Sequence, residues 1–188
     1  MKYLILGRSG TGKDYLQHKL EQKGFKSVLS YTTRPRRTPD ERTHVFISTE
    51  DAALFEKQKV ASAILNGYEY FATRSQLEEQ DTYIINPDGL YMLLSNMPDT
   101  DFSIVYVYTT NKDKSIQAIL DRSDNEDELN IHTNRLNDEH NQFSEFEQII
   151  VSDELIAKKL PKNVKQILTV RNDFNETDFD KIVSILAH

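Results

Sequence analysis

The chain has 188 residues, of which 38% are hydrophobic and 10% aromatic, enough to build one domain with a packed core. It contains no cysteine, so disulfides, thiolate nucleophiles and cysteine-bound zinc are excluded. The formal net charge of -7 argues against broad binding to nucleic-acid backbones. No long apolar run or hydrophobic signal core is present, and we expect a cytoplasmic protein that contacts no membrane.

Strands and helices are predicted to alternate along the chain. Residues 2–6 read as a short buried strand, residues 12–23 as a helix and residues 26–29 as a second strand. Further on, the pattern predicts a strand at 45–47, a helix at 49–59 capped by Thr49, and a hairpin of residues 60–65 and 68–71 around Asn66-Gly67. Thr73 and Gln76 resemble a capping box that opens a short helix.

The second half of the chain continues this alternation. Apolar runs at 83–85 and 102–108 are typical of central parallel strands. Helices are predicted at 89–96, 112–122, 126–143 and 177–186, with one more strand at 148–151. The order implies a three-layer α/β fold around a parallel sheet.

A glycine-rich loop lies between the first strand and the first helix. Gly7, Gly12 and Lys13 satisfy G-x-x-x-x-G-K in the strand-to-helix context that a phosphate-binding loop requires. Its amides, its lysine and the helix N-terminus attract phosphate, which predicts ATP binding. The residues assigned to ATP are Gly7, Arg8, Ser9, Gly10, Thr11, Gly12, Lys13 and Asp14.

Asp14 stands where a Ser or Thr usually provides a hydroxyl ligand for Mg²⁺. Its carboxylate oxygen is itself a suitable Mg²⁺ ligand, either directly or through water. Alternatively, its negative charge repels the nucleotide phosphates and weakens binding. The loop alone does not decide between these two effects.

Arginines gather in the segment TTRPRRTPDER, which contains Arg34, Arg36, Arg37 and Arg42. A local basic group in an acidic chain suggests a small phosphorylated ligand. With the preceding residues it reads SYTTRPRR and resembles the S-x-T-T-R-x-x-R segment of the guanylate kinase family. The resemblance implies that Ser30 contacts the acceptor base and that Arg34 and Arg37 hold the acceptor monophosphate.

Other segments extend this resemblance over most of the chain. NGYEYFA is similar to the family's G-N-Y-Y-G hairpin, which places Tyr70 at the acceptor phosphate, and His44 falls near a phosphate-contacting tyrosine. His44 either donates to phosphate or fills space. YIINPDGL resembles a strand end that bears acids, so Asp88, with Asn86 nearby, is expected at the acceptor and, with Asp14, at Mg²⁺.

The resemblance also implies a catalytic lid. The segment ILDRSDNEDELNIHTNRL is similar to the arginine-bearing region of the family, and it implies that Arg122 and Arg135 act with Lys13 on the transferring phosphoryl group. The expected architecture is a P-loop kinase fold in a single domain, residues 1–188. Its core covers about 1–30, 81–120 and 146–188, a small acceptor-binding β-subdomain is inserted at about 31–80, and a helical lid covers about 121–145.

The acceptor-base site departs from the family. A glutamate that reads guanine is expected nine residues before Tyr70, and this sequence has Ala61 there, with Ser62 beside it. The implied activity is transfer of phosphate from ATP, with Mg²⁺, to a nucleoside monophosphate, GMP or dGMP by family default. Another base, a non-nucleotide phosphate acceptor and a non-catalytic binding module stay open as alternatives, as does the oligomeric state.

Overall fold

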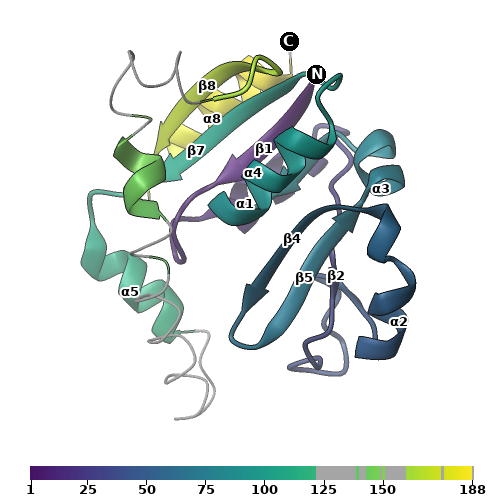
Figure 1. The fold of residues 1–188 in the computed structure, drawn as a ribbon. Coiled ribbons are helices and arrows are strands. Elements are labelled where there is room, and N and C mark those ends of the chain that lie inside the picture. Colours follow the sequence, from purple (N-terminus) through teal and green to yellow (C-terminus); the bar gives the residue numbers. More distant parts are fainter. Residues whose placement is uncertain (122–138, 140–142, 149, 151–159, 175, 188) are drawn as a thin grey trace.

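The computed structural model describes residues 1–121, 139, 143–148, 150, 160–174 and 176–187. Its centre is a four-stranded sheet in the order β6-β1-β7-β8, in which every neighbouring pair is parallel (Figure 1). The strands are β1 (Lys2–Leu6), β6 (Thr82–Ile84), β7 (Phe102–Tyr108) and β8 (Val164–Arg171). The nearly continuous apolar run of β7 occupies an inner position, as expected for a strand that is covered on both faces.

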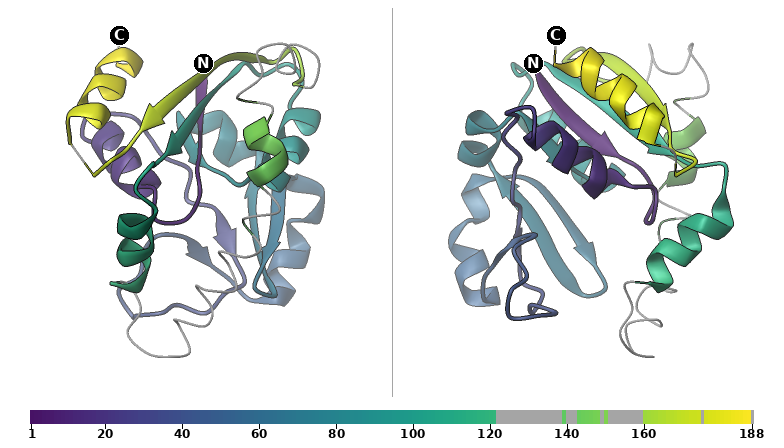
Figure 2. Two further views of the ribbon diagram at one scale, coloured as in Figure 1. Left: turned by 90° about the vertical axis from the view of Figure 1, so that its left-hand side faces the viewer. Right: turned by 180° about the vertical axis from the view of Figure 1, so that it is seen from behind.

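Helices cover both faces of this sheet (Figure 2). On one face, α1 (Lys13–Glu21) and α8 (Glu176–Leu186) pack on Ile5, Val105 and Val107. On the other face, α4 (Pro87–Asn96) and the helical residues 143–148 pack on Leu4, Leu6 and Ile104. Alternate residues of one strand therefore belong to two separate cores, and the predicted three-layer α/β fold is confirmed. The helix α5 (Lys112–Leu120) follows β7.

A second, smaller sheet has the order β3-β2-β5-β4. Its strands are β2 (Tyr31–Thr32), β3 (Val45–Phe46), β4 (Lys59–Leu65) and β5 (Tyr68–Thr73), and the flanking helices are α2 (Thr49–Leu54), the 3-10 turn Glu56–Gln58 and α3 (Arg74–Glu79). The predicted hairpin is confirmed: Asn66 and Gly67 have φ of 51° and 77°, as a type I′ turn requires. The predicted capping box of Thr73 and Gln76 is also present.

Several predicted elements differ from the structure. The strand expected at 26–29 is reduced to a single parallel bridge between Ser27 and Thr82. The strand expected at 148–151 was wrong, because Gln148 and Ile150 are helical. The helix expected at 49–59 ends at Leu54, and its cap is Ser48 rather than Thr49, since Ser48 accepts a hydrogen bond from the Asp51 amide.

The last sheet strand, β8, was not predicted at all. Most of the helix expected at 126–143 lies outside the described residues. None of the described helices is both long and apolar enough to span a membrane.

Candidate active site

One pocket of about 260 Å³ brings the phosphate loop and the arginine segment together. It is open between the carboxyl ends of the central strands and the smaller sheet, the usual ligand position in an α/β fold. The predicted site residues that line it are Gly7, Ser9, Gly10, Lys13, Asp14, Ser30, Arg34, Arg37, His44 and Tyr70. Segments far apart in the sequence therefore face one cavity.

Four predicted residues in the described part of the chain do not line this pocket: Arg8, Thr11 and Gly12, which belong to the phosphate loop itself, and Asp88. Asp88 is exposed in the first turn of α4, whereas its neighbour Asn86 does line the pocket. Arg122 and Arg135 lie outside the described residues, so their expected role stays a prediction.

The phosphate loop is held in shape by its own groups and by a residue from the far end of the chain. The Thr11 hydroxyl and the Lys13 ammonium donate to the Arg8 carbonyl at 2.8 and 2.9 Å. Asn172, buried after β8, donates its Nδ2 to the Thr11 carbonyl at 2.8 Å. Gly12 has a φ of 92°, and a Cβ there would lie 2.7 Å from Asn172 Nδ2, so both backbone conformation and space require glycine.

Two glutamates from the second half of the chain contact this loop. Glu139, only 5% exposed, accepts from the Ser9 amide at 2.7 Å and from the Ser9 hydroxyl at 2.5 Å. Glu147 accepts two hydrogen bonds from the Arg8 guanidinium, both at 2.7 Å, and one from the Tyr106 hydroxyl. The hydrogen bond to Glu147 raises the pKa of Arg8 despite partial burial.

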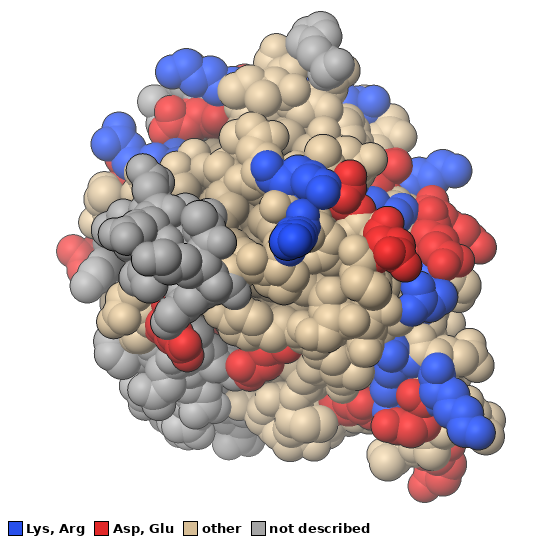
Figure 3. Space-filling view, turned by 45° about the horizontal axis from the view of Figure 1, so that its top comes forward, with Lys and Arg blue, Asp and Glu red and all other residues tan. Residues whose placement is uncertain are grey.

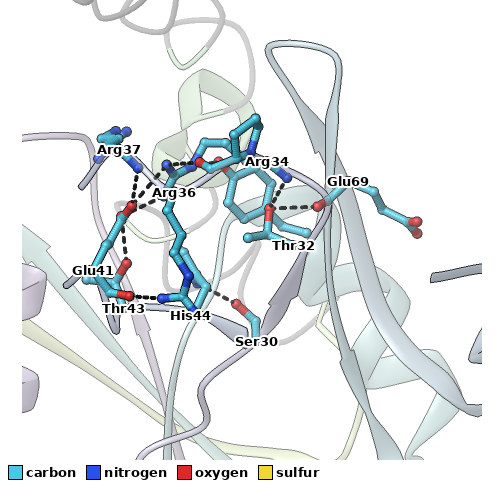
Figure 4. A network of polar contacts seen from close by, with 11 residues as sticks. Ser30, Thr32, Arg34, Arg36, Arg37, Glu41, Thr43, His44 and Glu69 are labelled. Carbon is cyan, nitrogen blue, oxygen red and sulfur yellow. Dashed lines mark hydrogen bonds and ion pairs between the residues drawn. The ribbon is translucent and has the colours of Figure 1, made fainter. Parts of the chain in front are cut away.

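A second ion pair orders the arginine segment (Figure 4). The Arg34 guanidinium donates to both carboxylate oxygens of Glu41, at 2.7 and 3.2 Å, and its Nε donates to the Tyr70 hydroxyl at 3.0 Å. Burial opposes ionisation of Glu41, but hydrogen bonds from Arg34, the Arg37 amide and Thr43 lower its pKa to about 2. Glu41 is therefore an anion across the physiological range, and it partly neutralises Arg34.

His44 provides an uncharged polar group in the pocket wall. Its Nδ1 lies 3.1 Å from the Ser30 hydroxyl, and its ring meets that of Tyr70 edge-on at 5.3 Å between centroids. Burial, followed by the charge of Arg34, lowers the pKa of His44 to about 4. The imidazole is thus neutral at pH 7 and contributes hydrogen bonding rather than positive charge.

The part of the pocket wall that β4 forms has no glutamate. Ala61 is buried opposite Ala72, and the β4 residues that line the pocket are Ser62, Ala63 and Leu65. The nearest acid of the hairpin, Glu69, does not line the pocket and accepts from Lys59 and Ser62 instead. This part of the described wall is therefore neutral.

The charged groups outside the pocket do not form a second anion-binding surface on the face in Figure 3. There, acidic and basic side chains are interspersed over the described part of the chain, without a continuous basic area. Among the described residues, no group of three or more histidines, aspartates and glutamates is arranged to hold a metal ion. Asp14 follows Lys13 in the sequence, and its carboxylate lines the pocket. A single carboxylate oxygen is a suitable protein ligand for Mg²⁺, because this ion usually keeps several water and phosphate ligands.

Sequence reasoning missed Glu41, Glu139, Glu147 and Asn172. Glu41 has a local signal, because it lies seven residues after Arg34 in the same loop. The other three contact the phosphate loop from 130 or more residues away. The only pattern that could have indicated two of them is the four-residue spacing of Glu139, Phe143 and Glu147, which is typical of one helix face.

The central sheet, its covering helices and the loop after β1 define an α/β fold of the P-loop kinase type. No protein-family model matches the sequence, and no curated protein matches it. Among solved structures, the guanylate kinase of Anaplasma phagocytophilum has a TM-score of 0.63 at 17% identity, over 98% of this chain and 84% of that one. An uncharacterized protein of Eubacterium ventriosum has a TM-score of 0.37 at 14% identity, over 98% of this chain and 95% of that one, a likeness too weak to support an argument. The fold is therefore guanylate-kinase-like.

Proposed function

We propose that this chain is an ATP-dependent phosphotransferase that converts a nucleoside monophosphate to the diphosphate. The observation that carries the proposal is the single pocket in which Lys13 and the loop glycines face Arg37, Tyr70 and Ser30. A kinase needs donor and acceptor phosphates side by side, because its catalysis is mainly positioning and charge stabilisation. In this proposal residues 31–80 form the acceptor-binding insert of one domain.

At the donor end, the loop amides and Lys13 hold the β- and γ-phosphates of ATP at the N-terminus of α1. Mg²⁺ supplies further neutralisation of the phosphate charge when it is bound with ATP. Asp14 is the loop carboxylate that would hold it, directly or through water. We prefer this role for Asp14 to simple repulsion because its side chain borders the same pocket as Lys13.

At the acceptor end, Arg37 is the residue best placed to bind a phosphate. No described residue pairs with its guanidinium, whereas Arg34 already binds Glu41 and Tyr70. An oxygen of the acceptor phosphate attacks the γ-phosphorus, and the bond from that phosphorus to the β-phosphate oxygen breaks. Its electron pair stays on ADP, and Lys13 and Arg37 offset the charge on the transferring group. Arg122 and Arg135, which lie outside the described residues, are proposed to offset this charge as well.

The acceptor base is the least constrained part of the proposal. GMP and dGMP follow from the guanylate kinase likeness, but Ala61 and the neutral Ser62, Ala63 and Leu65 offer no carboxylate for guanine's N1-H and amino group. A buried donor left without a partner costs about 1 to 3 kcal/mol. A different base is therefore a specific alternative, and Ser30 and His44 are the neutral polar groups that would read it.

The test is ADP formation from ATP and Mg²⁺ with GMP, dGMP, AMP, CMP, UMP and dTMP in turn. Lys13→Ala is expected to abolish turnover, and Lys23→Ala, which removes the same charge from an exposed position after α1, is expected to retain it. Turnover with one acceptor identifies the substrate. No turnover by the folded wild-type protein with any acceptor would contradict the proposal.

One observation favours the second candidate, a binding module without catalysis. The Arg34 guanidinium already donates to both carboxylate oxygens of Glu41, so part of its hydrogen-bonding capacity is used without any ligand. A module would bind a phosphorylated ligand at Arg37 and show no ADP formation. Binding of a monophosphate without turnover across the panel would support this second candidate.

A further inference from the structure

An acidic side chain occupies part of the loop that the proposed function assigns to ATP. Glu139 Oε2 accepts from the Ser9 amide at 2.7 Å, and Oε1 accepts from the Ser9 hydroxyl at 2.5 Å. These distances are typical of hydrogen bonds to an ionised acceptor. Ser9 lies inside G-x-x-x-x-G-K, where inward amides bind phosphate oxygens, so a carboxylate on Ser9 occupies a position suited to a phosphate.

Neighbouring contacts fix this glutamate on the loop. Phe143 lies beneath the Arg8 guanidinium, 5.7 Å from its centre, and Glu147 binds the same guanidinium through both oxygens. Glu139, Phe143 and Glu147 are spaced four residues apart, and all three contact the adjacent loop residues Arg8 and Ser9. Glu139 is therefore one of three described residues from this part of the chain that contact the loop.

The two glutamates differ in what they occupy. Glu147 neutralises a side chain, and it leaves the loop amides available to a ligand. Glu139 takes a backbone amide and a hydroxyl, lines the pocket, and is almost fully buried there. Of these two glutamates, only Glu139 occupies loop groups of the kind that bind a phosphate.

We propose that Glu139 is an internal anion that competes with a triphosphate for the Ser9 amide and hydroxyl. This inference rests on the proposed function, because it takes the loop to be the ATP site. ATP then binds only molecules in which Glu139 has left Ser9, and its apparent dissociation constant rises by the reciprocal of that fraction. The contact holds the loop in shape without ligand, and it couples nucleotide binding to departure of the Glu139 carboxylate from Ser9.

The test compares Glu139→Gln with Glu145→Gln by calorimetric titration with inorganic tripolyphosphate and with ATP. Both substitutions remove one negative charge, but Glu145 is exposed and does not line the pocket. We expect Glu139→Gln to bind both ligands about tenfold more tightly than wild type. Glu145→Gln should stay within about twofold, which measures the effect of net charge alone.

A second readout does not depend on affinity. The Ser9 amide proton of the ligand-free wild-type protein should resonate downfield because of its short bond to a carboxylate, and should move upfield in Glu139→Gln. Should Glu139→Gln not fold, Glu139→Asp takes its place, since it keeps the charge but is too short to reach both Ser9 groups. Circular dichroism establishes that each variant is folded.

The outcomes separate the two claims. Tighter binding by the Glu139 variant together with the Ser9 shift supports the inference. If wild type binds ATP and the Glu139 variant binds it with the same affinity, the inference is overturned but the ATP site stays in place. The same holds if the Ser9 amide resonance does not move in the variant. Absence of binding by all of the folded proteins overturns both.

Discussion

His44 is a titrating residue whose effect on stability has a defined sign. Its pKa is about 4 in the folded chain, below the ordinary 6.5, because it is buried and close to the charge of Arg34, while the charges of Glu41 and Asp14 oppose this shift. Between these values the unfolded chain binds more protons than the folded one. The free energy of unfolding should therefore fall as the pH drops from 6.5 to 4.

Substitution of His44 isolates this contribution. We expect His44→Asn to flatten the pH dependence of unfolding in that window, by roughly 2 kcal/mol between its ends. Urea denaturation at half-unit pH steps gives the free energy of unfolding of each protein. In the difference between wild type and variant, the contributions of the carboxylates that both proteins share cancel. If the free energies of unfolding of wild type and His44→Asn fell in parallel from pH 7 to 4, this would contradict the burial of a neutral His44.

Arg37 and its neighbour Arg36 provide a matched pair for the acceptor site. Arg37 lines the pocket, whereas Arg36 donates to the Glu41 carbonyl and lies over the Phe46 ring. Arg37→Ala should raise the KM for the acceptor monophosphate at least about tenfold, because a charge-assisted contact to phosphate contributes about 1.5 to 3 kcal/mol. The KM for ATP should change little.

Arg36→Ala is the control for loss of a loop arginine. It should leave both KM values within about threefold, since Arg36 supports the loop rather than the ligand. Steady-state kinetics with the acceptor found in the panel provide both numbers. Equal losses in the two variants would mean that the whole loop, and not the Arg37 guanidinium, binds the phosphate.

At this scale the sequence indicated which residues lie together, but it did not indicate most of the side-chain pairs among them. Ser30, Arg34, Arg37 and Tyr70 were assigned to one site, and the structure does bring them to one pocket. The pairing of Arg34 with Glu41 had a local signal in their closeness in the sequence, but the contact of Glu139 with Ser9 could not be predicted. A contact between residues so far apart in the sequence depends on where tertiary packing brings the two side chains, and the local charge pattern does not record it.

At the scale of the elements, β8 has a buried asparagine at each end. Asn163 precedes the strand and donates to the Leu94 and Met97 carbonyls, and Asn172 follows it and donates to the Thr11 carbonyl. The two side chains are 4% and 3% exposed. They therefore have similar structural roles, but only Asn172 touches the phosphate loop.

Alanine at each position should separate stability from binding. Both variants should unfold about 1 to 3 kcal/mol more easily, because each removes a buried amide that donates hydrogen bonds to backbone carbonyls. Only Asn172→Ala should also weaken ATP binding, by about fivefold or more, as the Thr11 to Gly12 turn loosens. Chemical denaturation and calorimetric titration measure the two effects. If Asn163→Ala weakened ATP binding as much as Asn172→Ala does, Asn172 would have no specific role in ATP binding.

Prediction of elements succeeded where the local signal was strong. The Asn66-Gly67 turn and the Thr73 capping box are local, and both are present. The strand β8 was missed because VKQILTVR mixes polar and apolar residues, and its pairing with β7 is what makes it a strand. Gln148 and Ile150 are helical although QII reads as a strand, since the face of Phe143 and Phe146 packs on the sheet as a helix.

At the scale of the whole molecule, the pocket joins two separate sheets. Lys13 follows β1 of the central sheet, while Tyr70 and Ala63 belong to the smaller sheet. The sheets are linked through α4, which packs on β4, and through Asn96, whose Nδ2 donates to the Val60 carbonyl. A ligand that spans the pocket must therefore stabilise both sheets together.

A dinucleoside pentaphosphate, which joins an ATP-like and an acceptor-like half, is the probe for this coupling. At about one hundred times its dissociation constant it should add about 2.7 kcal/mol and raise Tm by about 5 to 10 °C. At equal concentration it should exceed the shift given by ATP alone, because only the joined ligand reaches both Lys13 and Arg37. Lys13→Ala and Arg37→Ala should each reduce the shift, and Arg37→Ala should leave the smaller effect of ATP unchanged. If ATP alone gave the full shift in wild type and in Arg37→Ala, the two halves of the pocket would not be one site, and the kinase geometry would have to be abandoned in favour of an ATP site that acts by itself.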